Sequence, residues 1–115
     1  MRMELTLDCH DLDTLAAFWS ATLHYRRGSP GIEGYIALEP LAGDGVVLNL
    51  QRVPEPKLTK NRLHLDLLVE DVEAEVDRLL VLGATRLEDH SEYGTHWSVL
   101  ADPESNEFCV GRLPT

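Results

Sequence analysis

The stretch RLHLDLLVEDVEAEVDRLLVLGA, residues 62–84, decides the fold of this chain. In its first part apolar residues alternate with polar ones, which predicts a strand with an apolar face and a face that carries His64 and Asp66. Asp71 then stands where a helix N-cap is expected, and Gly83 is placed to end that helix in a left-handed cap. The buried side of the helix is expected to consist of Val72, Val76, Leu79 and Leu80.

The same pattern occurs a second time, 60 residues earlier in the chain. ELTLDCHD at residues 4–11 aligns with HLDLLVED at 64–71, and QRVP at 51–54 aligns with GRLP at 111–114, without a gap at either end. A fixed offset that holds at both ends indicates an internal duplication. The sequence therefore predicts one domain made of two copies of one unit: module 1 at residues 1–53, a linker at 54–61 and module 2 at 62–115.

Each module is expected to contain a strand, a helix and three strands, which is an α+β fold. In module 1 the expected elements are a strand at 4–9, a helix capped by Asp11 or Asp13 that ends near residue 24, a turn-rich connection at 26–34, and strands at 35–39 and 46–52. In module 2 the strand and helix are followed by a short strand at 85–88, a loop at 89–94, and strands at 95–101 and 107–112.

The period-two alternation also assigns side chains to the two faces of each sheet. On the last strand of module 1, Leu48 and Leu50 are expected to face the helix, and Asn49 and Gln51 the opposite side. In module 2, Ser98 and Leu100 are expected on the helix side. The opposite side is then expected to carry Trp97, Val99, Glu107 and Cys109. Cys9 lies on the helix side of its own strand, so a disulfide with Cys109 is not expected.

Composition narrows the classes of partner. The formal net charge of −10 disfavours nucleic acid and anionic membranes as partners. It would favour a cationic small molecule, although such acidity also serves solubility alone. No apolar run approaches the roughly 20 residues of a membrane span, and the first residues lack the apolar block of a signal peptide. These features predict a cytoplasmic protein.

The order and spacing of these features resemble the vicinal oxygen chelate superfamily, which includes glyoxalase I, extradiol dioxygenases, thiol-transferring fosfomycin resistance enzymes and bleomycin resistance proteins. The resemblance rests on the strand-to-helix opening that occurs twice, on the duplication, and on DPESNEFCV at 102–110, which is similar to the family's DP-x-G-N ending. It implies two βαβββ modules that form a curved mixed sheet around a cleft. It also implies a homodimer, which the exposed sheet edges of so small a chain would favour.

The resemblance further implies metal ligands at the start of the first strand and on the last strand of each module. Glu4, Asn49, His64 and Cys109 occupy these places. Glu4 and His64 are ordinary ligands of a divalent metal, and Cys109 is a ligand for softer ions. Asn49 departs from the family pattern because a neutral amide replaces a carboxylate. Cys109 departs as well, since the glutamate of this hairpin, Glu107, stands two residues earlier on the same face.

Two classes of function follow. The first is a metal-free protein that binds or sequesters a small molecule, as the bleomycin resistance proteins do. The second is a divalent-metal-dependent lyase, dioxygenase or transferase, with Glu4, His64 and Cys109 as metal ligands. In either class a tryptophan on the cleft side would offer a flat apolar wall, and Asp66 or Glu107 could act as a general base or receive a cation. The expected ligand-contacting residues are Asn49, Gln51, Asp66, Trp97, Val99 and Glu107.

Overall fold

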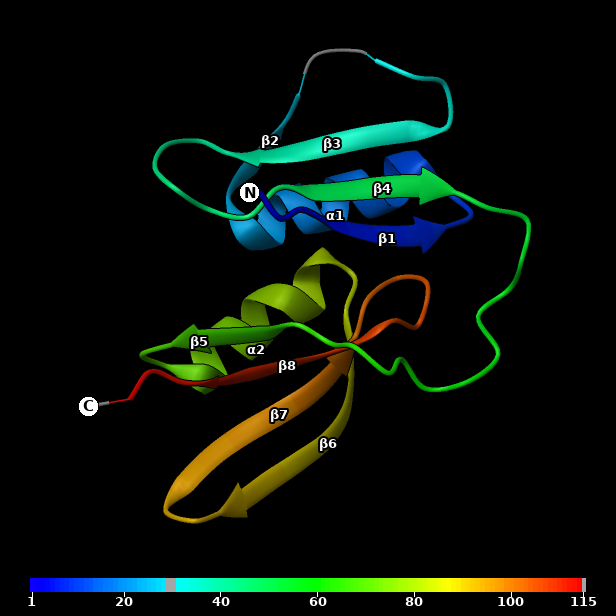
Figure 1. Ribbon diagram of the computed structural model, residues 1–115. Helices are drawn as coiled ribbons and strands as arrows, with labels where there is room; N and C mark the ends of the chain where they lie inside the picture. Colours follow the sequence, from blue (N-terminus) through cyan, green and yellow to red (C-terminus); the bar gives the residue numbers. More distant parts are fainter. Residues whose placement is uncertain (29–30, 115) are drawn as a thin grey trace. The chain divides into compact units, whose positions relative to one another are not determined.

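The computed structural model describes residues 1–28 and 31–114 of the chain. The chain divides into two compact units, the first comprising Met1–Pro56 and the second beginning at Lys57. Each unit has the predicted order of strand, helix and three strands (Figure 1). Neither helix of the described residues is long and apolar enough to cross a membrane.

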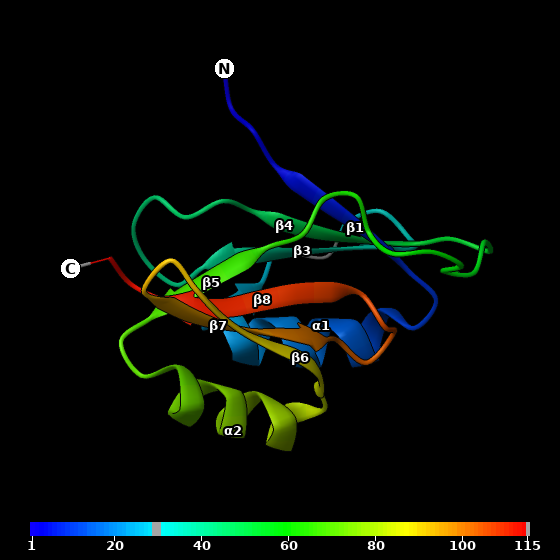
Figure 2. The ribbon, with the colours of Figure 1, turned by 90° about the horizontal axis from the view of Figure 1, so that it is seen from below.

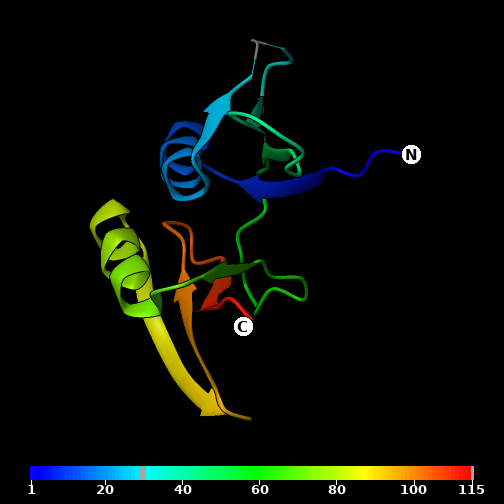
Figure 3. The ribbon, with the colours of Figure 1, turned by 90° about the vertical axis from the view of Figure 1, so that its left-hand side faces the viewer.

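The first unit is a four-stranded mixed sheet with one helix. Its elements are β1 (Leu5–Cys9), α1 (Leu12–Leu23), β2 (Tyr25–Arg27), β3 (Tyr35–Pro40) and β4 (Leu48–Arg52). The strand order is β1-β4-β3-β2, with β1 parallel to β4 and the other pairs antiparallel. The helix lies against one side of this sheet (Figure 3).

The second unit repeats this arrangement. Its elements are β5 (Asp66–Val69), α2 (Val72–Leu82), β6 (Thr85–Glu92), β7 (Thr95–Ala101) and β8 (Glu107–Arg112). The strand order is β5-β8-β7-β6, again with the outer pair β5–β8 parallel. Figure 2 shows α2 along one side of its sheet, which leaves the opposite face to carry the candidate site.

Both helices begin with the same capping interaction. Asp11 accepts a hydrogen bond from the backbone N–H of Thr14 at 3.1 Å, and Asp71 accepts one from that of Ala74 at 3.1 Å. Such a cap satisfies an N–H that has no partner within the helix. Of the two candidate caps for the first helix, Asp11 is therefore the correct one.

The duplication extends to the register of the strands. Thr6 pairs with Asn49 in the first unit, and Asp66 pairs with Cys109 in the second. Both residues of the second pair lie 60 positions after those of the first. The two parallel strand pairs are thus the same backbone arrangement with different side chains.

The predicted assignment of residues to sheet faces is confirmed. Leu48 and Leu50 are buried toward α1, whereas Asn49 and Gln51 on the other face are half-buried. In the second unit the fully buried residues that pack under α2 include Ser98, Leu100, Phe108 and Val110. Leu80 was expected on the buried side of the helix and lies on its solvent side instead, with 38% of its surface exposed. Leu79, the residue before it, is instead fully buried on the side of α2 that faces the sheet.

Two predicted boundaries are wrong for the same reason. Residues 26 and 27, expected at the start of a connection, belong to β2 (Tyr25–Arg27), and residues 89–92, expected in a loop, belong to β6. Both segments are polar edge strands held by backbone pairing, which leaves little apolar alternation to detect. In β6 a register shift between Arg86 and Glu88 disturbs the alternation further. Only Tyr93 and Gly94 form the turn, both with positive φ (54° and 72°), as a two-residue hairpin turn of type I′ requires.

Ser105 takes the place of the glycine in the family's DP-x-G-N ending, and it has φ of 69°. A residue with a side chain loses about 1–2 kcal/mol of stability in this left-handed region. Glycine avoids that loss, but it gives up more conformational entropy on folding than other residues do. We expect Ser105→Gly to raise the free energy of unfolding by up to about 1 kcal/mol, measured by urea denaturation. Glu104→Gly, at a neighbouring position without positive φ, is the control and should lower it. A loss of stability in Ser105→Gly would contradict this account of the turn.

Candidate functional site

Three side chains with metal-ligating chemistry meet on the face of the second sheet opposite α2. His64 precedes β5, Asp66 is its first residue, and Cys109 is the register partner of Asp66 in β8. The His64 Nε2 and Asp66 Oδ1 atoms are 3.3 Å apart, and the potential ligand atoms of all three residues lie within 4.8 Å of one another. His64 and Cys109 were expected at metal positions and Asp66 among the ligand-contacting residues. The structure brings them into one cluster.

The Cys109 thiol is held in its protonated form. Burial raises its pKa, and the negative charge of Asp66 together with a hydrogen bond to that carboxylate raises it further. The charge of Lys60 acts in the opposite direction but does not reverse the shift. A thiol in this environment is a poor nucleophile, so the cluster does not favour covalent catalysis by cysteine.

The equivalent positions of the first unit hold a different interaction. The Asn49 side-chain amide donates a hydrogen bond of 2.8 Å to Glu4 Oε1, and Arg2 forms an ion pair with the same carboxylate. The hydrogen bond from Asn49, and then Arg2, lower the pKa of Glu4. Glu4 is thus already engaged within its own unit, and its predicted sharing of one metal ion with His64 stays a prediction.

Glu107 is engaged in holding the segment before β5. Its carboxylate accepts a hydrogen bond of 3.0 Å from the backbone N–H of Asn61 and pairs with the Lys57 ammonium at 3.1 Å. Burial alone would raise the pKa of Glu107, but these hydrogen bonds and the Lys57 charge outweigh it and lower the pKa. A carboxylate with these partners anchors residues 57–61 to β8 more readily than it serves as a base.

Trp97 lies on the same face of the sheet as Cys109. It is half-buried, and Val99 on the same strand pairs with Cys109. Its indole stacks on the ring of His90, its register partner in β6, with centroids 5.1 Å apart and planes 17° apart. No role was predicted for His90, because its spacing in the sequence indicated no partner. Tyr93-Gly94 could have been interpreted as a two-residue hairpin turn. Counting pairs outward from that turn places His90 opposite Trp97.

A second group of potential ligands surrounds a guanidinium. Glu73, Asp89 and His96 have ligand atoms within 4.8 Å of one another. Arg86 lies among them, 2.7 Å from Glu73 Oε1 and 2.8 Å from Asp89 Oδ1. Because this cation already pairs with both carboxylates, the group acts as an ionic clamp between α2 and the β6–β7 hairpin.

The ionic clamp predicts acid sensitivity. The hydrogen bond from Arg86 lowers the pKa of Glu73, and hydrogen bonds from Ser98 and then Arg86 lower that of Asp89. Each folded-state pKa lies below its unfolded value, so the resulting stability is present above about pH 4 and is lost as the pH falls through the folded-state values. Urea denaturation of Arg86→Met should show a smaller loss of stability between about pH 6 and pH 3 than the parent. Arg62→Met, at an exposed position, should follow the parent, and an unchanged profile in Arg86→Met would contradict the assignment.

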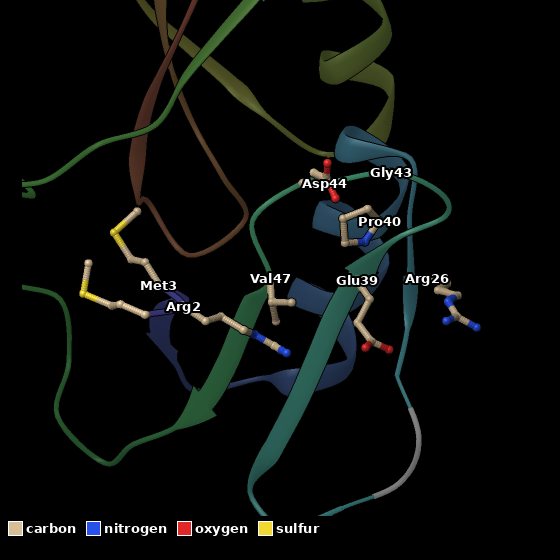
Figure 4. A pocket seen from close by; sticks show the side chains of 10 residues that line it. Arg2, Met3, Arg26, Glu39, Pro40, Gly43, Asp44 and Val47 are labelled. Atoms are coloured by element: carbon tan, nitrogen blue, oxygen red, sulfur yellow. The ribbon is translucent and has the colours of Figure 1, made fainter.

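A shallow pocket in the first unit lies apart from the predicted residues. Its lining comes from the start of the chain, from β2 and β3, and from the loop after β3 (Figure 4). Arg2, Met3, Arg26, Glu39, Asp44 and Val47 are among the lining residues. None of the predicted site residues is among the lining residues described for it.

Two units that each contain a strand, a helix and three strands, with a parallel strand pair at one edge of each sheet in equivalent register, define the vicinal oxygen chelate class of folds. A family model described as a glyoxalase-like domain matches residues 4–111. The chain therefore belongs to the glyoxalase-like domain family, within that superfamily.

Solved structures give the same fold at low sequence identity. A glyoxalase/bleomycin resistance protein/dioxygenase family enzyme from Burkholderia phytofirmans PsJN is 16% identical, with a TM-score of 0.79 over 96% of this chain and 97% of that one. The fosfomycin resistance protein FosX from Listeria monocytogenes is 12% identical, with a TM-score of 0.80 over 99% and 93%. A variant of the latter, solved with Mn(II) and dihydroxypropylphosphonic acid, is 12% identical with a TM-score of 0.78 over 94% and 86%. No curated protein matches this chain significantly.

Proposed function

We propose that the protein binds a small, planar, cationic molecule on the face of the second sheet opposite α2. The observation that carries the proposal is the half-buried Trp97, whose indole stacks on His90 beside Val99 and Cys109. An aromatic side chain on an accessible sheet face offers a flat surface for stacking, and its ring face attracts a cation by about 0.5–2 kcal/mol.

Charge supports a cationic ligand over an anionic one. Asp66 is exposed on the same face, and Glu88 lies 2.8 Å from the His90 ring that stacks on Trp97. The whole chain carries a formal charge of −10, which repels anions and concentrates cations near its surface. Carboxylates on two strands of the sheet and the net charge therefore favour the same class of ligand.

The test is a titration with matched probes. N-methylquinolinium, neutral quinoline and a quinoline carboxylate are titrated into the protein and followed by tryptophan fluorescence and calorimetry. We expect the cation to bind most tightly, Trp97→Ala to weaken it several-fold or more, and Asp66→Asn to weaken the cation but not the neutral probe. Tyr93→Ala, which removes an aromatic side chain that is 95% exposed at the hairpin tip, is the matched control and should bind as the parent does. Equal binding in Trp97→Ala and the parent would overturn the proposal.

A second candidate function is favoured by the cluster of His64, Asp66 and Cys109. The nitrogen, oxygen and sulfur donors of this cluster, within 4.8 Å of one another, fit a divalent metal ion. Such an ion supplies Lewis-acid polarisation of substrate oxygens when bound. Metal analysis of protein purified without chelator, with His64→Ala as the control, separates this candidate from metal-free binding. A stoichiometric ion in the parent that is absent from His64→Ala is the expected result for the metal-dependent class.

We also propose a homodimer, from the family resemblance and from edge strands β2 and β6, each of which pairs on one side within its sheet. Light scattering at micromolar concentration should give twice the mass of one 12.9 kDa chain. A monomeric mass would contradict the proposal.

A further inference from the structure

We propose that His64, Asp66 and Cys109 form a three-ligand site, complete within the second unit, that selects a thiophilic ion such as Zn²⁺ over Mn²⁺. This inference rests on the metal-dependent candidate of the proposed function and specifies its ion. It differs from the arrangement implied by the sequence resemblance, in which ligands come from both modules. In this site the donor from the first module is replaced by Asp66, two residues after His64 on the same strand segment.

The geometry supports a tetrahedral ion. Metal–ligand distances of about 2.0–2.3 Å at tetrahedral angles place neighbouring donor atoms about 3.3–3.6 Å apart. The His64 Nε2 and Asp66 Oδ1 atoms are already 3.3 Å apart, and the Cys109 sulfur lies within 4.8 Å of both. Because Asp66 and Cys109 are register partners on adjacent parallel strands, the backbone fixes their separation. Side-chain rotations that bring the Cys109 sulfur to about 3.5 Å from both atoms would close the site.

The donor set selects the ion. Cys109 would bind as a thiolate, so the ion would have to displace the proton that burial and Asp66 hold on the thiol. Thiolate sulfur is a soft ligand that suits Zn²⁺, whereas Mn²⁺ prefers oxygen donors in octahedral geometry. One nitrogen, one oxygen and one sulfur ligand leave a fourth tetrahedral position open, as in catalytic zinc sites with three protein ligands. Cys109 is therefore the residue that decides between the two ions.

The chain provides two internal comparisons. The equivalent positions of the first unit hold Glu4, Thr6 and Asn49, with Glu4 bonded to Asn49 and paired with Arg2. The group of Glu73, Asp89 and His96 resembles a metal site in composition, but Arg86 already pairs with its carboxylates. Of these three groups, the cluster at Cys109 is the one that combines a sulfur donor with accessible nitrogen and oxygen donors.

The test measures metal binding directly. Zn²⁺, Mn²⁺ and Co²⁺ are titrated separately into metal-stripped protein, and Co²⁺ reports a cysteine ligand through its thiolate-to-metal charge-transfer absorption. We expect Zn²⁺ to bind at least about tenfold more tightly than Mn²⁺. Cys109→Ser should lose the charge-transfer band, and Cys109→Glu should bind Mn²⁺ more tightly and Zn²⁺ more weakly than the parent. Cys9→Ala, which removes the other thiol, and Asp89→Asn, which alters the ionic clamp, should keep the band.

A second measurement does not depend on any variant. Bound Zn²⁺ should slow alkylation of the Cys109 thiol by iodoacetamide in the parent protein, and Mn²⁺ at the same concentration should not. Binding of both ions with equal affinity, or a Co²⁺ complex without the charge-transfer band, would overturn the selectivity and leave the metal-dependent candidate standing. If none of the three ions binds, both the ion selectivity and the metal-dependent candidate function are wrong. Stacking of a planar cation on Trp97 is a separate proposal with its own test.

Discussion

Replacing Trp19 with alanine is expected to lower the free energy of unfolding by about 3–5 kcal/mol, the usual loss for a large aromatic side chain deleted from a core. Trp19 is 2% exposed on α1, and its ring packs edge-on against that of Phe18 with centroids 5.2 Å apart. Its removal would leave a cavity between the helix and the first sheet that neighbouring side chains fill only in part. Thermal or urea denaturation measures the effect.

Trp97→Ala is the matched comparison because it truncates the other tryptophan of the chain. Trp97 lies on the face opposite α2 and is partly accessible, so its loss removes a stacking contact worth about 0.5–1.5 kcal/mol and less apolar burial. We expect a clearly smaller loss of stability than in Trp19→Ala. If Trp97→Ala unfolded the protein and Trp19→Ala did not, the core face and the accessible face of the sheets would have to be exchanged.

Asp102→Ala is expected to cost about 2–4 kcal/mol, from lost hydrogen bonds to a charged group and from the buried donors left behind. Asp102 is 3% exposed in the turn between β7 and β8. Its Oδ1 accepts hydrogen bonds from the backbone N–H groups of Glu104 at 2.8 Å and Asn106 at 3.0 Å. The Asn106 side-chain amide donates to Oδ2 at 2.9 Å. The carboxylate therefore organises the whole turn.

Asp102→Asn gives the informative intermediate. Its amide oxygen can still accept from the two backbone N–H groups and, at 3.1 Å, from the Asn106 side-chain amide. Its NH₂ group takes the place of Oδ2 and cannot accept from that amide. We expect a loss of stability between that of the parent and that of Asp102→Ala, measured by urea denaturation. Equal losses in both variants would show that the hydrogen bond from the Asn106 side chain to Oδ2 accounts for the whole effect.

The fold could be predicted largely from local pattern. The caps at Asp11 and Asp71 and the alternation on β4, β7 and β8 depend on neighbouring residues, and the 60-residue repeat can be read directly from the sequence. The structure confirms all three features. Edge strands β2 and β6 depend instead on pairing with a distant strand. Their polar side chains leave no local signature, so both were missed wholly or in part.

For the candidate site, the sequence predicted which sheet face each residue lies on, but not which residues lie next to one another. The alternation of side chains placed Asp66 and Cys109 on one side of the sheet. Their adjacency depends on the register between two strands about 40 residues apart, and the alternation within each strand does not determine that register. The engagement of Glu107 by Lys57 and Asn61 depends on how the preceding segment folds back on β8. Similarly, Glu4 was assigned as a ligand by position alone, and its bond to Asn49 depends on the pairing of β1 with β4.

The shared register of the two parallel strand pairs makes the chain its own template for engineering. Because Thr6–Asn49 and Asp66–Cys109 occupy matching places in two copies of one backbone, a side-chain set can be transplanted by adding or subtracting a fixed residue number. Carrying His64, Asp66 and Cys109 back requires three substitutions, Glu4→His, Thr6→Asp and Asn49→Cys. These substitutions also remove the ion pair between Arg2 and the carboxylate of Glu4. After the duplication, the two copies have thus kept one backbone arrangement but hold different side chains at these three positions.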